Sequence, residues 1–392
     1  MLTPALLPAI QQQLADLDLD GWLLYDFRGT NGIASGLLGF DGLVSRRVFA
    51  WLPREGTPVG IQHAIEPGPW ARWPAEWPRI TYSGWRALET ELATLVSGKR
   101  IAMEYSPGDA VPYLDRVPAG VLEMVRATGA TVVSSGELVS AVYAVWTAAD
   151  RASHERAAEH IRRIAHEAFD IAGARARTAS PAAEHELQAY ILEAFDRVGL
   201  HTDHGPDCAA SENAANPHYE PSAARPRLVR EGDTLLIDLW ARETGGVYAD
   251  QTWMASVGAP SARAITIWEA IRDARDAALD LLRTRLEAGD DVRGAEADDA
   301  ARAVIEARGF GPYFTHRTGH SIDARELHGS GPQLDHLESR DSRLLLPGVG
   351  FSVEPGIYIA GEIGMRTEVN ALVLERGLLV TPGVIQRDLL VL

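Results

Sequence analysis

The sequence predicts an α+β domain preceded by a smaller α/β domain. The chain has 392 residues, which is longer than one hydrophobic core usually grows. Strand-like and helix-like segments alternate over residues 1–145, whereas long helices bracket a largely antiparallel set of strands over residues 146–392. We therefore predict a domain boundary near residue 145.

The first domain is expected to be a mixed sheet covered by helices. Apolar periodicity predicts helices at 3–17, 84–96 and 117–128, and strands at 21–25, 46–53, 58–63, 99–105 and 131–135. Residues 66–78 should be irregular, because each proline there removes a backbone donor. No phosphate-loop spacing occurs, so a nucleotide site of that kind is not predicted.

The second domain is expected to begin with two helices, at 150–176 and 184–199, with Gly199 as the stop of the second. The polar stretch 201–221 is predicted to be a loop. Strands around Asp238 and Asp250, helices at 262–287 and 294–308, and strands through Glu354 and Glu368 complete the prediction.

Composition excludes several classes of protein. A formal charge of -17 and a pI near 5.2 argue against nucleic-acid or anionic-membrane partners. The single cysteine, Cys208, rules out an internal disulfide and a cysteine-based zinc cluster, and we predict that it is a small buried hydrophobe. No apolar run reaches the length of a membrane span and no signal peptide is recognisable, so a cytoplasmic location is expected.

Two common hydrolytic motifs are absent. His154-Glu155 and His166-Glu167 begin like the zinc motif HExxH, but Ala158 and Asp170 stand where the second histidine should be. We therefore predict that these pairs form a solvent-facing helix surface. No G-x-S-x-G elbow supplies a serine nucleophile.

Acidic residues within apolar strands point to metal chemistry instead. A lone buried carboxylate is costly without a partner, and bound cations would supply that partner. Four carboxylates and one imidazole form an oxygen-rich set that suits two divalent ions such as Mn, Co or Zn. The candidate ligands are Asp238, Asp250, Glu354, Glu368 and one of the histidines of the segment 316–328.

The stretches LLIDLW, YADQT, SVEPGIYI and GMRTE, which carry these carboxylates, resemble the pita-bread-fold metallopeptidases. That family includes methionine aminopeptidase, Xaa-Pro aminopeptidase and Xaa-Pro dipeptidase. The resemblance to the proline-peptidase branch covers essentially the whole chain. It implies a pita-bread catalytic domain after a creatinase-like α/β domain. It also implies that Asp238 chelates one metal, that His320 and Glu354 bind the other, and that Asp250 and Glu368 bridge them.

The same resemblance implies roles around the reacting peptide. Glu354 would shuttle the proton of an attacking, metal-bridging hydroxide, and His218 and His328 would donate hydrogen bonds near the carbonyl. His316 would line the pocket for the residue after the scissile bond, and Arg366 would orient the carboxylates. A short peptide substrate and a homodimer are expected on this basis.

Departures from the family affect positions that face substrate. Arg317 replaces a glycine after the pocket histidine, and Arg325 lies in a lengthened segment before His328. A guanidinium there would pair with a substrate carboxylate, so we predict recognition of the C-terminus by an Xaa-Pro dipeptidase-like enzyme. The alternatives are a metallocarboxypeptidase of altered specificity, an Xaa-Pro aminopeptidase, a metal-free creatinase-like hydrolase and a non-catalytic pita-bread binding module.

Overall fold

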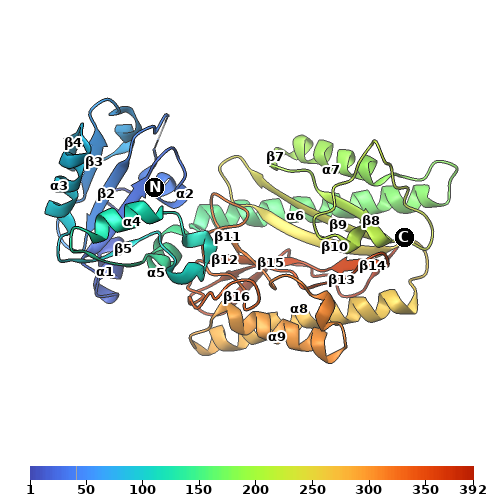
Figure 1. Ribbon diagram of the computed structural model, residues 1–392. Coiled ribbons are helices and arrows are strands. Elements are labelled where there is room, and N and C mark those ends of the chain that lie inside the picture. Colours follow the sequence, from blue (N-terminus) through green and yellow to red (C-terminus); the bar gives the residue numbers. More distant parts are fainter. Residues whose placement is uncertain (41) are drawn as a thin grey trace. The chain divides into compact units, whose positions relative to one another are not determined.

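The computed structural model describes residues 1–40 and 42–392. The chain divides into two compact units, Met1–Tyr143 and Ala144–Leu392 (Figure 1).

The N-terminal unit is built on one mixed sheet with the strand order β4-β3-β2-β1-β5-β6. Its central strand β1 pairs antiparallel with β2 and parallel with β5, and every residue of β1 is buried. Apolar clusters cover both faces of the sheet. The strands are β1 (Gly21–Asp26), β2 (Val48–Pro53), β3 (Val59–His63), β4 (Arg79–Tyr82), β5 (Arg100–Met103) and β6 (Thr131–Ser134). The helices are α1 (Leu7–Asp16), α2 (Gly32–Leu38), α3 (Trp85–Val96), α4 (Ala119–Arg126) and α5 (Gly136–Leu138).

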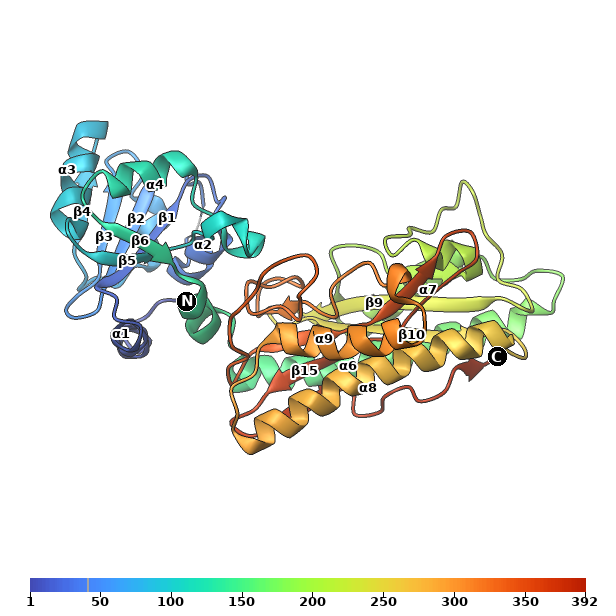
Figure 2. The same ribbon diagram turned by 60° about the horizontal axis from the view of Figure 1, so that its bottom comes forward.

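The C-terminal unit places curved sheets between two pairs of helices (Figures 1 and 2). The long helix α6 (Ala148–Ala176) begins with a capping box between Thr147 and Asp150, and it packs with α7 (Glu184–Val198) on one side. Helices α8 (Ala262–Ala288) and α9 (Gly294–Ala307) pack on the other side. Gly199 ends α7 in the left-handed conformation, as predicted. None of the described helices is long and apolar enough to span a bilayer.

Three sheets form the middle of this unit. The first has the order β17-β10-β9-β7, with β8 also paired to β9; its strands are β7 (Leu200–His201), β8 (Asp207–Ala210), β9 (Thr234–Glu243), β10 (Ala249–Ser256) and β17 (Leu390–Val391). The second has the order β11-β12-β15-β16; its strands are β11 (Ser321–Ile322), β12 (Gly350–Val353), β15 (Val369–Val373) and β16 (Leu378–Thr381). The third pairs β13 (Gly356–Ile359) with β14 (Ile363–Arg366).

The strands predicted to run through Glu354 and Glu368 are each divided into two shorter strands. Glu354 lies between β12 and β13, next to Pro355, which has no N–H to donate to a ladder. Glu368 lies between β14 and β15. Both glutamates are therefore at breaks in pairing, where the backbone turns and the side chain leaves the regular alternation of a strand.

Two other predictions were wrong. The stretch 201–221 is not all loop, because β8 forms within it by pairing with β9. His154 does not lie on a solvent-facing surface: it is 1% exposed and bonds the Tyr248 carbonyl and the Thr381 hydroxyl, each at 2.7 Å. Burial lowers the pKa of His154 to about 4, so this histidine is a neutral link between α6 and the sheets.

Candidate metal centre

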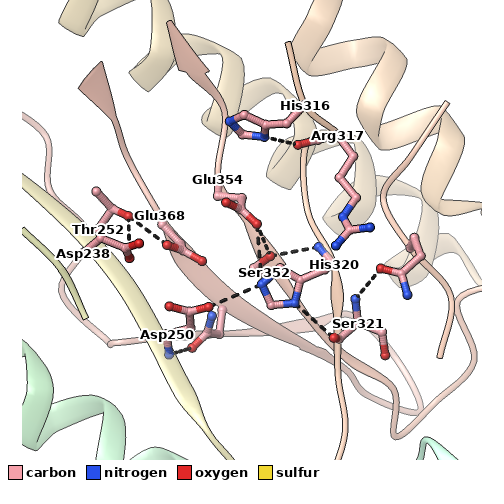
Figure 3. A network of polar contacts seen from close by, with 12 residues as sticks. Asp238, Asp250, Thr252, His316, Arg317, His320, Ser321, Ser352, Glu354 and Glu368 are labelled. Carbon is pink, nitrogen blue, oxygen red and sulfur yellow. Dashed lines mark hydrogen bonds and ion pairs between the residues drawn. The ribbon is translucent and has the colours of Figure 1, made fainter. Parts of the chain in front are cut away.

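The candidate ligands come together from separate strands and strand breaks of the C-terminal unit. Asp238 is on β9 and Asp250 is on β10, where the register pairs Asp238 with Thr252. His320 directly precedes β11, and the two glutamates are at the breaks described above. Figure 3 shows the carboxylates of Asp250, Glu354 and Glu368 and the ring of His320 turned toward a common space.

Donor atoms of Asp250, His320 and Glu368 lie within 4.8 Å of one another, and all three residues are buried. His320 Nε2 is 3.3 Å from Asp250 Oδ2 and 3.5 Å from Glu354 Oε1. The other ring nitrogen, Nδ1, lies 3.1 Å from the Ser321 carbonyl. Because a carbonyl only accepts, Nδ1 carries the proton, and burial lowers the pKa of His320, which keeps the ring neutral.

With its proton on Nδ1, His320 presents Nε2, a hydrogen-bond acceptor, to carboxylate oxygens that are acceptors as well. The Nε2 lone pair of a neutral His320 points at carboxylate oxygens, and none of these groups can donate a hydrogen bond to another when the acids are ionised. Glu368 adds Oε1, which is buried and has no hydrogen-bond partner among the described residues. A divalent cation satisfies such a set, and orientation of the histidine by a carbonyl is typical of a metal ligand. The residues therefore fit a metal site.

Asp238 has a different environment from the other acids. Thr252 Oγ1 donates to Asp238 Oδ1 at 3.0 Å, and Arg366 Nη2 pairs closely with Asp238 Oδ2. Thr252 Oγ1 also lies 2.8 Å from Glu368 Oε2. Arg366 Nη1 lies 3.4 Å from the Tyr358 hydroxyl. Arg366 thus orients Asp238, and Thr252 ties it to Glu368.

The electrostatics of the site favour a bound cation. Burial and the neighbouring charge of Glu354 raise the pKa of Asp250 to about 8. Burial, opposed by Arg366 and reinforced by Asp250, raises the pKa of Asp238 to about 7, and burial with Asp250 raises that of Glu368. Burial and the charge of Asp238 also raise the pKa of Asp207 to about 8. The ionised carboxylates of this site would therefore carry more negative charge than the neighbouring cationic side chains neutralise.

Glu354 is the exception among these carboxylates. Burial acts to raise its pKa, but the neighbouring His320, His316, Arg366 and Arg317 together lower it. Ser352 Oγ donates to Glu354 Oε1 at 3.0 Å, and the same hydroxyl accepts from the His320 backbone N–H at 2.9 Å. Glu354 is consequently the acid that stays ionised most readily.

A cavity of about 740 Å³ opens onto the centre. All five candidate ligands line it, together with His218, His328 and Arg366. The His328 side chain is exposed, and its ring lies 4.2 Å, centroid to centroid, from that of His320; the proximity of this second imidazole lowers the pKa of His328. His218 is exposed. The predicted site residues thus fall into two groups: the candidate metal ligands at the centre, and the residues that form the surrounding wall of the cavity.

Two of the predicted substrate residues are not in that wall. Among the described residues the cavity lining includes Arg325 but neither His316 nor Arg317. His316 is instead held between the Arg317 carbonyl, at 2.7 Å, and the Tyr358 hydroxyl, at 2.8 Å. Arg317 is 9% exposed and acts on Glu354 through its charge.

Sequence reasoning missed three supporting residues, and two of them left a signal. Thr252 follows Asp250 by two positions on one strand, so alternation places both side chains on the same face. Ser352 precedes Glu354 by two positions in the same way. Asp207 was missed because its strand was predicted to be loop.

Helices around a pita-bread arrangement of sheets, with a buried Asp/His/Glu centre facing a cavity, are the architecture expected of a metallopeptidase. Residues 151–375 match the model of Metallopeptidase family M24, and the chain belongs to that family.

Similar proteins agree with this assignment. The chain is 30% identical over 287 residues to the probable dipeptidase PepE of Mycobacterium tuberculosis, covering 73% of this chain and 67% of that protein. It is 36% identical over 160 residues to the Xaa-Pro dipeptidase of Lactobacillus delbrueckii subsp. lactis, covering 41% and 39%.

Solved structures show the same fold over the full chain. The dipeptidase PepE of Mycobacterium ulcerans has a TM-score of 0.78 at 24% identity, covering 99% of this chain and 97% of that one. The prolidase of Thermococcus sibiricus has a TM-score of 0.70 at 22% identity and full coverage of both chains. The N-terminal α/β domain and the C-terminal pita-bread domain are thereby confirmed.

Proposed function

We propose that this protein is a dinuclear-metal exopeptidase that hydrolyses dipeptides, with an Xaa-Pro dipeptide as the first substrate to test. The observation that carries the proposal is the His320 Nε2 lone pair facing the carboxylates of Asp250 and Glu354. The names of the dipeptidase relatives support the substrate class. Asp238, Asp250, His320, Glu354 and Glu368 would hold two ions of Mn, Co or Zn.

Two such ions supply Lewis acidity, which makes a water nucleophilic near neutral pH and polarises the scissile carbonyl. The protein's own groups do the rest. Glu354, ionised and held by Ser352, accepts the proton of the attacking water and delivers it to the leaving nitrogen. His328 is neutral and lines the cavity beside His320, so its N–H is available to the carbonyl oxygen. His218 donates from the exposed part of the wall.

A guanidinium in the cavity supports recognition of the substrate carboxylate. Arg325 lines the cavity and Arg242 Nη1 donates to the Arg325 carbonyl at 2.9 Å, so two arginines lie close together on that side. Arginine binds a carboxylate through paired, charge-assisted hydrogen bonds. We assign the carboxylate contact to Arg325, with Arg317 acting on Glu354 behind it and His316 positioning Tyr358.

The test compares the free-acid and C-terminally amidated forms of one dipeptide in the wild type, Arg325→Ala and Arg317→Ala. We expect the wild type to prefer the acid by about tenfold in kcat/KM, because a charge-assisted pair is lost in the amide. Arg325→Ala should lose this preference mainly through KM, whereas Arg317→Ala should lower kcat.

Equal cleavage of acid and amide by the wild type would favour an aminopeptidase instead. Trimming of longer peptides at the C-terminus would favour a carboxypeptidase. Purified protein that holds metal but cleaves no peptide would favour a binding module. A homodimer and a cytoplasmic location remain predictions, and sedimentation of the purified protein tests the first.

A further inference from the structure

Asp207 shares a cavity wall with Asp238. The two residues are directly opposed in the antiparallel pair of β8 and β9, where opposed side chains project from the same face about 5 Å apart. The next residue, Cys208, is fully buried in the apolar cluster under α6 and α7. Alternation therefore turns Asp207 the other way, into the cavity that it lines.

The two opposed carboxylates differ in their partners. Asp238 is paired with Arg366 and accepts from Thr252. The Asp207 carboxylate, which is half-buried, has no hydrogen bond or ion pair with any of the described residues. When both carboxyl groups are ionised, like charges placed directly opposite each other destabilise a strand pair. A positively charged ligand would remove that cost.

Charges of both signs line the cavity. Asp207 and Asp238 are opposed on one wall, and Glu220 lies near enough to act on Asp207. Arg242 and Arg325 are joined by a hydrogen bond, with Arg242 stacked 4.4 Å above the Tyr248 ring. Among the residues that the structure describes, eight carboxylates and three guanidiniums line the cavity. A dipeptide carries a charge complementary to each sign, with an ammonium at one end and a carboxylate at the other.

We propose that Asp207 is a specificity residue that binds an ammonium group of the substrate on the amino side of the scissile bond. This inference rests on the proposed peptidase function. Two parts of a peptide carry that chemistry: the free α-ammonium and the side chain of an N-terminal lysine. Asp207 accepts from the N–H groups of either, and Glu220 adds negative charge nearby.

The first experiment measures binding without turnover. Metal-loaded protein is titrated calorimetrically with four amides: lysinamide, norleucinamide, and the N-acetyl form of each. Norleucinamide carries only the α-ammonium, N-acetyl-lysinamide carries only the side-chain ammonium, and N-acetyl-norleucinamide carries neither. The amide whose affinity depends on Asp207 identifies which ammonium is bound.

The variant is Asp207→Asn, which removes the charge and keeps the shape. The matched control is Glu326→Gln, which removes one charge from the same cavity on the segment before His328. We expect the preference for an ammonium-bearing amide over N-acetyl-norleucinamide to fall about tenfold in Asp207→Asn and much less in Glu326→Gln. Metal content, measured by elemental analysis, should be equal in all three proteins.

An unchanged preference in Asp207→Asn overturns the inference. Loss of a metal equivalent in that variant also overturns it, because Asp207 would then serve the metal ions. Hydrolysis of neutral dipeptides by the wild type tests the proposed function separately. Cleavage without any effect of Asp207→Asn on the binding preference would leave the peptidase standing and remove the ammonium site.

Discussion

Glu104 in the N-terminal unit and Glu368 in the C-terminal unit are both buried carboxylates, but their surroundings differ. Glu104 Oε1 accepts from Trp22 Nε1 at 2.5 Å and from Ser135 Oγ at 3.2 Å, and Glu104 Oε2 accepts from Asn31 Nδ2 at 2.8 Å. Both of its oxygens therefore have donors.

Glu368 Oε1 has no hydrogen-bond partner in the part of the chain that the structure describes, and burial, together with the charges of Asp250, Glu354 and Asp238, raises the pKa of this residue. A buried acid that neutral donors satisfy holds a fold together. A buried acid that faces other acids and retains a free lone pair is complete only with a cation. Burial alone therefore does not distinguish a structural carboxylate from a metal ligand. What distinguishes them is whether hydrogen-bond donors of the protein contact both carboxylate oxygens.

The largest expected effect comes from removing a buried acid that faces other acids at the candidate metal centre. Asp250→Ala should lower kcat/KM by at least about 100-fold and release at least one equivalent of metal, because it deletes a ligand from a set held by strands. Its free energy of unfolding without added metal should not fall, since mutual repulsion of the carboxylates decreases. Peptide turnover, elemental analysis and urea denaturation check these outcomes. Full activity in metal-free wild type would end the dinuclear proposal.

The corresponding substitution at Glu104 should lower the stability of the N-terminal unit and leave the metal content unchanged. Glu104→Ala leaves the Trp22, Asn31 and Ser135 donors without their acceptor, so the N-terminal unit should lose about 2–3 kcal/mol of unfolding free energy. Hydrogen exchange of peptides from β1 and β5 measures this locally. Metal content should equal that of the wild type, and a loss of metal would contradict the contrast drawn above.

A smaller effect is expected from pH. Burial raises the pKa of Glu104 from 4.5 to about 7, with its three side-chain donors opposing that rise. A carboxyl group whose folded pKa is raised stabilises the fold below its unfolded pKa, and this contribution is lost as the pH rises through the folded value. Protection of β1 and β5 should therefore fall by about 2 kcal/mol between pH 5 and pH 8. A Glu104→Gln variant should show no such fall, because glutamine does not titrate.

The sequence allowed most of the candidate metal centre to be proposed, since Asp238 and Asp250 each stand out in an apolar, strand-forming run. Thr252 could have been added by alternation. Glu104 also lies in a predicted strand, but nothing local indicates its partners: its donors Trp22 and Asn31 are 82 and 73 residues away, and only the folded sheet brings them together.

Two features depended on tertiary contacts that local patterns do not encode. β8 is four residues long and follows a proline, so the segment has strand geometry only because β9 pairs with it. His154 follows the helical period of a long polar helix, and its burial comes from packing against Trp146 and the Tyr248 carbonyl. The substrate wall was predicted least well, because the orientation of Arg317 depends on the path of the segment between His316 and His320.

Cys208 offers a natural reporter on the wall that carries Asp207. It is the only cysteine of the chain, it is fully buried, and burial raises the pKa of its thiol, so alkylating reagents meet neither an accessible nor an ionised sulfur in the native fold. The thiol becomes reactive only when β8 separates from the helices above it. The rate of alkylation therefore reports how often β8 separates locally from its neighbours. If a bound amide slows alkylation, the decrease in rate measures how much the ligand stabilises the closed strand pair.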